Sequence, residues 1–287
     1  MPGATYATGT EPNSIVATDW NRDGKLDLAV ANYFSGTVTL FQNNGSGVFT
    51  SSSVIVGGNL RGIVAGDWNG DGRPDLAVTK AGSGVQILLG DGTGSFPQSF
   101  IALGNSSQAL TTADFNGDGK PDLAVAGPQV TVLLGNGTGG FAQASGSPIL
   151  AGTDPVSIAA TDLNGDGFAD LAVANATSNN VTVLLGNGTG AFTQAAGSPV
   201  AAGNKPYWVA TGDLNGNGKP DLVVANRNTS NVTVLLGNGS GTFVPAPASP
   251  LSVGTNVYFV ALADLNRDGQ LDLATAKVKQ QSFCNFA

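Results

Sequence analysis

Residues 162–170 read DLNGDGFAD, and the pattern that they carry, Asp-x-Asn-x-Asp/Asn-Gly-x-x-Asp, occurs six times along the chain. The six copies occupy residues 19–27, 67–75, 114–122, 162–170, 213–221 and 264–272, so that their starts are separated by 48, 47, 48, 51 and 51 residues. A motif that returns at a nearly constant period of this length is typical of a fold built from repeated units. The content of one repeat therefore decides the architecture.

Each repeat carries four stretches that read as short strands. In the fourth repeat, an apolar stretch at 156–161 precedes the loop, two apolar runs follow at 171–175 and 181–185, and a Gly-Asn-Gly-Thr-Gly turn leads to Phe192 and a last extended segment. Short runs bounded by Gly and Asn are typical of strands, and the 42 Gly residues suit tight turns and disfavour helices. We therefore predict an all-β fold, a β-propeller of four-stranded blades. The rival fold, a parallel β-helix, usually has shorter coils and does not need two hairpin turns in each repeat.

The two ends of the chain favour a ring of six blades. Residues 6–18 parallel residues 200–211 in their small and apolar positions, while the last repeat supplies only two further strand-like segments, at 273–278 and 282–287. Pairing of an N-terminal fourth strand with the last blade would remove two exposed sheet edges. We expect one domain over residues 1–287, with blades at about 12–58, 59–105, 106–153, 154–204, 205–255 and 256–287 plus 1–11. The alternative is a fragment of a longer ring.

The acidic residues are concentrated in the repeated loops. Glu11 is the only Glu, and of the 19 Asp residues only Asp91 and Asp154 lie outside the loops. Calcium prefers six to eight hard oxygen ligands, and the side chains at loop positions 1, 3, 5 and 9 with the backbone carbonyl of position 7 would provide them. Several carboxylates in one turn repel one another without a cation. The alternative, Asx turns without metal, does not explain an Asp at positions 1 and 9 of every copy.

We therefore predict about six Ca²⁺ ions, one in each repeat. The predicted ligands are Asp19, Asn21, Asp23, Lys25 and Asp27; Asp67, Asn69, Asp71, Arg73 and Asp75; Asp114, Asn116, Asp118, Lys120 and Asp122; Asp162, Asn164, Asp166, Phe168 and Asp170; Asp213, Asn215, Asn217, Lys219 and Asp221; and Asp264, Asn266, Asp268, Gln270 and Asp272. The fifth loop carries Asn217 where the others carry Asp, and with one charge fewer it is expected to bind calcium most weakly.

The six loops and the recurrent Leu-Leu-Gly-Asn-Gly-Thr/Ser-Gly-x-Phe hairpins resemble the FG-GAP (VCBS-type) repeats of the integrin α-subunit propeller, over essentially the whole chain. The resemblance implies a β-propeller with calcium between the first and second strands of a blade. It also implies adhesion or ligand binding, including carbohydrate recognition in fungal and bacterial relatives, and some polysaccharide lyases use related propellers. The chain departs from integrins, which have seven blades and calcium loops in only some of them.

Charge and composition exclude several classes of function. A formal net charge of −8 argues against a nucleic-acid or anionic-membrane partner. The chain has no His, which excludes His-based catalytic triads and His-ligated zinc. A lyase would need Tyr with a basic partner, and the sequence pairs none with Tyr6, Tyr33, Tyr207 or Tyr258. We expect no enzymatic activity, with a polysaccharide lyase-like enzyme as the alternative.

The expected function is a calcium-binding platform for adhesion to protein or carbohydrate ligands, with a calcium-dependent lectin as the alternative. Trp20 and Trp68 stand at loop position 2, where the other copies have Phe or Leu, which favours interior packing. Tyr207, Trp208 and Tyr258 have no aromatic equivalents in most repeats and are the better candidates for a ligand surface, with packing within the strands as the alternative for each.

The compartment is inferred from the calcium loops, because extracellular modules often bind calcium at about 10⁻⁴ to 10⁻³ M. We therefore expect a secreted or cell-surface protein. Residues 1–10 lack a signal peptide, which leaves a cytosolic protein or a removed signal as the two readings. No apolar run approaches the roughly 20 residues of a membrane span.

The hairpin asparagines Asn136, Asn187 and Asn238 match glycosylation sequons, although Asn-Gly is also a common turn former. Cys284, the only cysteine, excludes an internal disulfide.

Overall fold

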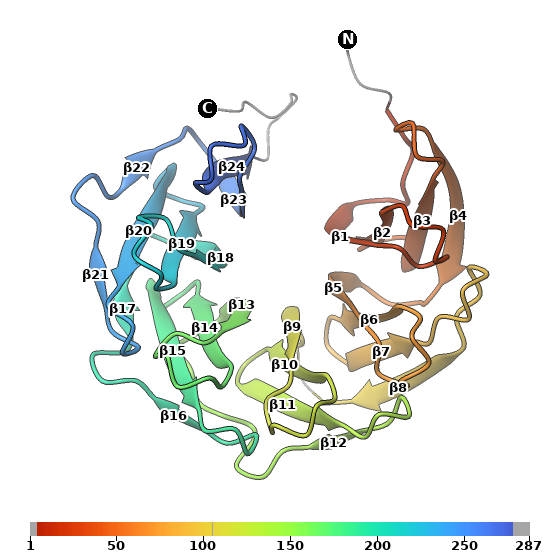
Figure 1. The fold of residues 1–287 in the computed structure, drawn as a ribbon, viewed down its shortest axis with the longest axis horizontal. Helices are drawn as coiled ribbons and strands as arrows, with labels where there is room; N and C mark the ends of the chain where they lie inside the picture. The colour runs from red at the N-terminus through yellow and green to blue at the C-terminus, as the bar shows by residue number, and fades with distance from the viewer. Residues whose placement is uncertain (1–4, 105, 278–287) are drawn as a thin grey trace. The chain divides into compact units, whose positions relative to one another are not determined.

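The computed structural model describes residues 5–104 and 106–277, and in these residues it contains 24 β-strands and no helix (Figure 1). The first three sheets are antiparallel meanders whose hydrogen-bonded neighbours are consecutive in the sequence; the fourth and fifth sheets add a fifth strand that pairs with the third, and the last sheet has two described strands. A meander of four antiparallel strands in each of the first five repeats confirms the prediction of propeller blades. The number of blades, their limits and the closure of a ring remain predictions.

The chain divides into two compact units. The first comprises the described residues of Met1–Thr112 together with Gly119–Gly127 and Leu133–Gln143, and the second those of Ala113–Asp118, Pro128–Val132 and Ala144–Ala287. Two sheets lie wholly within the first unit. They consist of β1 (Pro12–Thr18), β2 (Asp27–Asn32), β3 (Thr37–Asn43) and β4 (Phe49–Ile55), and of β5 (Leu60–Gly66), β6 (Asp75–Lys80), β7 (Gly84–Leu88) and β8 (Gln98–Ala102).

A third sheet has the same order and places most of its residues in the first unit. It consists of β9 (Ala109–Ala113), β10 (Asp122–Ala126), β11 (Val130–Gly135) and β12 (Phe141–Gln143).

The second unit contains the remaining sheets. They consist of β13 (Pro155–Thr161), β14 (Asp170–Asn175), β15 (Asn180–Gly186), β16 (Phe192–Gln194) and β17 (Val200–Ala201); of β18 (Pro206–Gly212), β19 (Asp221–Asn226), β20 (Asn231–Gly237), β21 (Phe243–Pro245) and β22 (Leu251–Ser252); and of β23 (Val257–Ala263) with β24 (Asp272–Lys277). The segment 282–287, expected to form a third strand of the last sheet, lies outside the described residues.

In the first five sheets the second strand is largely buried on both faces because neighbouring sheets stack on it. All six residues of β14 and of β19 are buried. In the second unit, Val183 of one sheet packs with Val209 and Leu222 of the next. This stacking explains why these strands read as continuous apolar runs instead of alternating polar and apolar residues.

The first strands of neighbouring sheets lie side by side within each unit: β1 beside β5, and β18 between β13 and β23 (Figure 1). Serine hydroxyls connect some of these strands, since Ser157 Oγ accepts a hydrogen bond from the Val209 amide at 3.2 Å. Most of these strands contain a register irregularity near their start, which in β18 falls between Pro206 and Trp208 and in β23 between Val257 and Phe259. Tyr207 and Tyr258 are therefore bulge residues.

The described part of the N-terminal segment contacts the first sheet. The Tyr33 amide donates a hydrogen bond to the Glu11 carbonyl at 2.8 Å, and the Tyr6 ring packs edge-on against Phe41 and Phe49. The expected pairing of residues 1–11 with the last blade involves residues outside the described range, and it stays a prediction.

Candidate metal centre in the repeated loops

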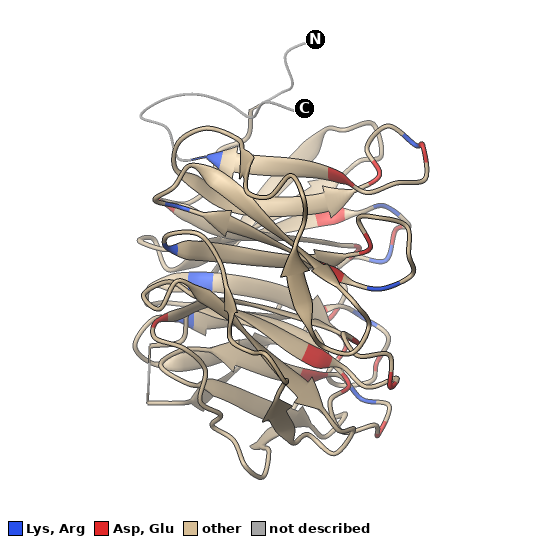
Figure 2. Cartoon of the chain, turned by 90° about the vertical axis from the view of Figure 1, so that its left-hand side faces the viewer, with Lys and Arg blue, Asp and Glu red and all other residues tan. Residues whose placement is uncertain are grey.

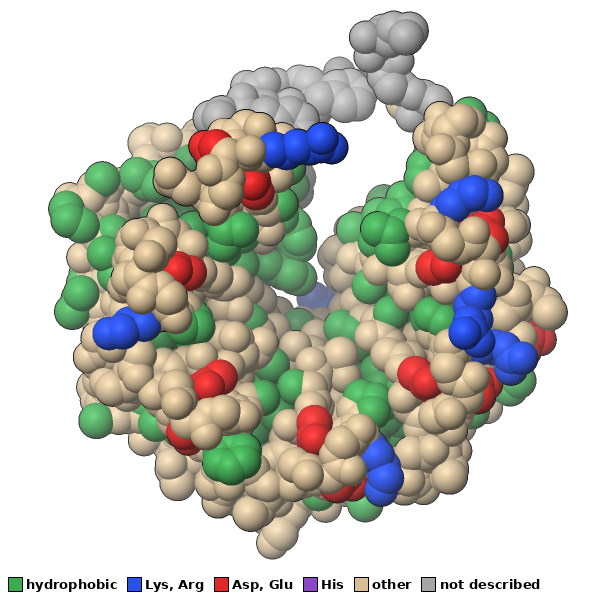
Figure 3. Space-filling model, viewed as in Figure 1, with side chains coloured by type: hydrophobic (Ala, Val, Ile, Leu, Met, Phe, Trp, Pro, Cys, Tyr) green, Lys and Arg blue, Asp and Glu red, His purple; other side chains and the backbone are tan. Residues whose placement is uncertain are grey.

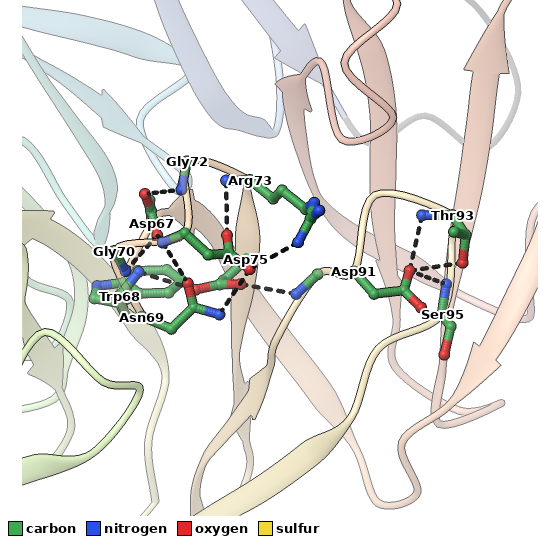
Figure 4. A network of polar contacts seen from close by, with 12 residues as sticks. Asp67, Trp68, Asn69, Gly70, Gly72, Arg73, Asp75, Asp91, Thr93 and Ser95 are labelled. Atoms are coloured by element: carbon green, nitrogen blue, oxygen red, sulfur yellow. Dashed lines mark hydrogen bonds and ion pairs between the residues drawn. The ribbon is translucent and has the colours of Figure 1, made fainter.

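Each loop connects the first strand of a sheet to the second, and the loop between β5 and β6 shows its geometry (Figure 4). Asp67 at position 1 accepts hydrogen bonds from the amides of Gly70 at 2.8 Å and Asp71 at 3.2 Å through Oδ1, and from Gly72 at 2.8 Å through Oδ2. Asn69 Oδ1 accepts from the Asp71 amide at 3.0 Å. Backbone amides therefore hold the side chains of positions 1 and 3 inside the turn.

Position 5 is held by the same kind of contact. Asp71 Oδ1 accepts from the Arg73 amide at 2.8 Å, and the Arg73 guanidinium lies 3.3 Å from Asp71 Oδ2. The Arg73 amide is also the largest cause that lowers the pKa of Asp71. Hydrogen bonds from backbone amides likewise lower the pKa of Asp213 at position 1 of the fifth loop. These carboxylates therefore remain ionised at neutral pH and can attract a cation.

The pattern recurs in the other copies. The position-1 carboxylate accepts amide hydrogen bonds within its loop in every repeat, at Asp19, Asp67, Asp114, Asp162, Asp213 and Asp264. The Asn at position 3 accepts from the amide of position 5 in every repeat, at Asn21, Asn69, Asn116, Asn164, Asn215 and Asn266. The predicted residues at positions 1, 3 and 5 are thus brought together six times.

The Asp at position 9 has a different environment. Asp170 is fully buried; its Oδ1 accepts from the Gly186 amide at 2.7 Å and its Oδ2 from the Leu163 amide at 2.8 Å. Gly186 ends the third strand of the sheet, so this carboxylate connects the loop to β15. Burial raises the pKa of Asp170 to about 6, and the nearby Asp166 and Asp162 carboxylates contribute. Burial likewise raises the pKa of Asp27 and of Asp75.

The loop residues fit a hard divalent cation. Buried Asp27 Oδ2 has no hydrogen-bond partner among the described residues, and an anionic oxygen in that state is costly unless a cation is near. The described residues contain no group of three acidic side chains placed to hold a metal ion by themselves. A cation in these loops would therefore also need the Asn amide oxygen of position 3 and the backbone carbonyl of position 7, as calcium ligation commonly does.

In the first four loops, the residue at position 2 is buried in the interior. Trp68 is fully buried, its carbonyl accepts from the Gly139 amide at 2.8 Å, and its ring lies 6.2 Å from that of Phe141. Phe115 makes the same two contacts with Gly190 and Phe192. The predicted interior packing of this position is confirmed at the first four loops, whereas Leu265 in the sixth is exposed.

The hairpin asparagines act as turn formers. Asn136 Oδ1 accepts hydrogen bonds from the Thr138 amide at 2.8 Å and from the Thr138 hydroxyl at 2.9 Å, and Asn187 and Asn238 do the same. Asp91 has this role in the second sheet (Figure 4). This supports the turn interpretation of Asn136, Asn187 and Asn238. Cys284 lies outside the described residues.

The tyrosines have basic partners that the sequence does not predict. The Arg227 guanidinium lies over the rings of Tyr207 and Tyr258, and that of Arg61 lies over Tyr33. These partners are 20 to 31 residues apart in the chain, and no local motif announces them. The only sequence signal was the absence of equivalent aromatic residues in most repeats.

A model of FG-GAP-like repeats matches residues 19–78, 67–125, 114–173, 162–224 and 213–275 of the chain. Each match runs from one loop past the start of the next, so the family model covers nearly all of the described residues. Among curated proteins, no sequence matches this chain.

Several solved structures are similar in fold. A lectin from Agrocybe aegerita, studied for specific recognition of non-reducing terminal N-acetylglucosamine, is 24% identical with a TM-score of 0.63, over 93% of this chain and 75% of that one. BBS1N, solved in complex with ARL6DN, is 13% identical with a TM-score of 0.66, over 94% of this chain and 76% of that one. A protein from Lactobacillus plantarum is 22% identical with a TM-score of 0.65, over 87% of this chain and 73% of that one.

Proposed function

This chain belongs to the FG-GAP-like repeat family, and from that premise we propose that it is a calcium-dependent binding platform that acts outside the cell on protein or carbohydrate ligands. Propeller repeats and a lectin of similar fold support the role of a binding platform. The observation that carries the calcium dependence is the repeated oxygen-rich loop, in which backbone amides hold the side chains of positions 1 and 3 and the carboxylate at position 9 is buried in the first five copies.

Calcium would be held, in each repeat, by the side chains of positions 1, 3, 5 and 9 and by the carbonyl of position 7. Its charge would offset the repulsion among the loop carboxylates and the cost of burying the one at position 9. Because position 9 also accepts amides from its loop and from the third strand, as Asp170 does, a bound ion would stiffen three strands of the sheet. Metal binding of this kind adds to the free energy of unfolding.

We propose no enzymatic role. The chain lacks His, and the Asp side chains are engaged in the loops or, as at Asp91, in a turn. A secreted or cell-surface location follows from the calcium concentration that such loops usually require. In the described part of the chain, no helix is long and apolar enough to cross a membrane. The acidic composition disfavours nucleic acid as a partner.

A calcium-dependent lectin is the second candidate. It is favoured by the partly exposed aromatic pairs Tyr207–Tyr258 and Trp208–Phe259, whose ring centroids are 4.9 and 4.4 Å apart. Aromatic side chains with a polar tip are common at binding surfaces.

The deciding experiment is a calcium titration of the metal-stripped protein by calorimetry, with thermal unfolding in calcium and in EDTA. We expect about six bound ions and a higher unfolding midpoint in calcium, with Mg²⁺ as the control cation. A glycan array, read with calcium and with EDTA, then separates the lectin from the protein-binding platform. An identical unfolding midpoint in calcium and EDTA would refute the calcium dependence.

A further inference from the structure

Tyr207, Tyr258 and Arg227 form a compact group in the second unit, which we call the tyrosine–arginine cluster. Arg227 Cζ lies 5.5 Å from the ring centroid of Tyr207 and 4.4 Å from that of Tyr258. The two rings are 4.9 Å apart at 67°. All three side chains are partly exposed, so a ligand can reach them from solvent.

The backbone presents the two tyrosines at β-bulges. Tyr207 and Tyr258 are the extra residues at the irregularities of β18 and β23, and a bulge commonly re-aims a side chain at a binding site. The same position holds Asn13 in β1 and Val156 in β13, although the strands around it repeat closely. Because the position tolerates such different side chains, the sheet itself does not require tyrosine there.

The polar side-chain atoms of the cluster have no partner within the described part of the chain. Among residues 5–104 and 106–277, neither the Arg227 guanidinium nor either tyrosine hydroxyl has a hydrogen-bond or ion-pair partner. A guanidinium has five N–H donors in a planar fork, and each phenol hydroxyl both donates and accepts. Stacking on two rings orients Arg227 without using any of these donors. The cluster therefore presents an oriented cation and two hydroxyls to the solvent.

Two lysines lie near the cluster along the backbone. Lys205 directly precedes β18, and its carbonyl accepts from the Arg227 amide at 3.0 Å, while Lys277 pairs with Val257 at the start of β23. Among the described residues of the second unit, Asp154 is the only acid outside the loops.

The acidic loops follow the opposite ends of β18 and β23. Figure 2 shows most of the acids at the loop end of the strands, where basic residues also lie, and further basic residues at the opposite strand ends, and Figure 3 looks onto the loop face. An anion is therefore favoured at the cluster, away from the loops.

We propose that the tyrosine–arginine cluster binds an acidic saccharide, that is, a sugar bearing a carboxylate or a sulfate group. The Arg227 fork matches two oxygens of such a group. The tyrosine rings offer apolar surface to the sugar body, and their hydroxyls can bond its hydroxyl groups. The inference rests on the proposed role as a binding platform, and it places the anionic ligand at the end of the sheets away from the calcium loops.

The test is affinity electrophoresis of the calcium-loaded protein through gels that contain polygalacturonate (carboxylate), dextran sulfate (sulfate), unsubstituted dextran or polyglutamate. We expect retardation by one or both acidic polysaccharides and none by dextran. Arg227→Gln should weaken that binding at least about tenfold, because a charge-assisted hydrogen-bond pair is lost. Arg227→Lys keeps the charge but lacks the planar fork of donors, so its affinity for the acidic polysaccharide should lie between those of the parent and Arg227→Gln.

The matched control is Arg61→Gln, since Arg61 lies 5.2 Å over the single ring of Tyr33 in the first unit. Arg61→Gln should bind the polysaccharides as the parent does. Equal losses in Arg61→Gln and Arg227→Gln would show diffuse charge attraction and overturn the proposal, as would equal, Arg227-dependent binding of polyglutamate. Binding that survives Arg227→Gln but not EDTA would place the anion on loop calcium and also overturn it.

Thermal unfolding with and without calcium is measured on every variant. Arg227→Gln should keep the parent midpoint and the parent calcium shift, so that lost binding is not lost folding. If the parent shows no calcium shift but binds through Arg227, the calcium proposal fails and the saccharide site stands. If it shows the calcium shift but binds neither acidic polysaccharide, the saccharide site fails alone.

Discussion

Replacing Asp170 with Ala separates the two roles of the position-9 carboxylate, its hydrogen bonds and its proposed calcium ligation. The side chain is fully buried and accepts the amides of Gly186 and Leu163 at 2.7 and 2.8 Å. Truncation leaves two buried N–H donors without an acceptor, at about 1 to 3 kcal/mol each. We therefore expect Asp170→Ala to lower the free energy of unfolding by about 2 to 6 kcal/mol in EDTA at pH 5, where Asp170, with its pKa raised to about 6, is mostly protonated and the cost of its buried charge is absent.

The matched variant is Asp166→Ala, at position 5 of the same loop. Asp166 is exposed and accepts the Phe168 amide at 2.9 Å and the Asn164 side-chain amide at 2.9 Å. Water can replace these contacts, so the loss in EDTA should stay within about 0.5 kcal/mol. In calcium at 100 times the dissociation constant, loss of one site removes about 2.7 kcal/mol.

Both variants are compared with the parent by urea unfolding in EDTA and in calcium. The expected result is that Asp170→Ala destabilises in both conditions and Asp166→Ala mainly in calcium. If Asp166→Ala loses the same free energy in EDTA as in calcium, position 5 is not a calcium ligand. If Asp170→Ala is neutral in EDTA at pH 5, its two buried hydrogen bonds do not support the sheet and the reasoning is wrong.

Three further outcomes are expected. Trp68→Ala should lower the free energy of unfolding in urea by about 3 to 5 kcal/mol, because it empties a buried site against Phe141. The control, Leu265→Ala at the exposed position 2 of the sixth loop, should change it by less than about 0.5 kcal/mol. Similar losses in the two variants would contradict the packing argument. In EDTA the midpoint of thermal unfolding should rise as pH falls from 7 to 5. The pKa of Asp170 is raised to about 6, so the folded state binds the proton more tightly than the unfolded state. A falling midpoint would show that burial of Asp170 does not dominate the pH dependence of stability. Asn217→Asp restores the third carboxylate of the fifth loop, and calorimetry should show tighter calcium binding at one site, with the other sites unchanged.

The sequence by itself determined the repeat, the strands and the loops, because these depend on local chemistry. A Gly permits the turn of each loop, and apolar runs bounded by Gly and Asn form strands wherever they are placed in the repeat. Substitution of Trp20 and Trp68 by Phe or Leu in other copies was enough to predict interior packing. Positions 1, 3 and 5 of the loops meet because they lie within five residues of one another.

Only the tertiary structure decided which distant groups meet. Asp170 turns to the amide of Gly186, 16 residues away, because the third strand returns beside the second in a fixed register. Arg227 reaches Tyr258 because two sheets stack and a bulge presents the tyrosine at their common end. Such contacts depend on strand register and sheet packing, which join residues far apart in the chain, and the local pattern of a repeat does not encode them.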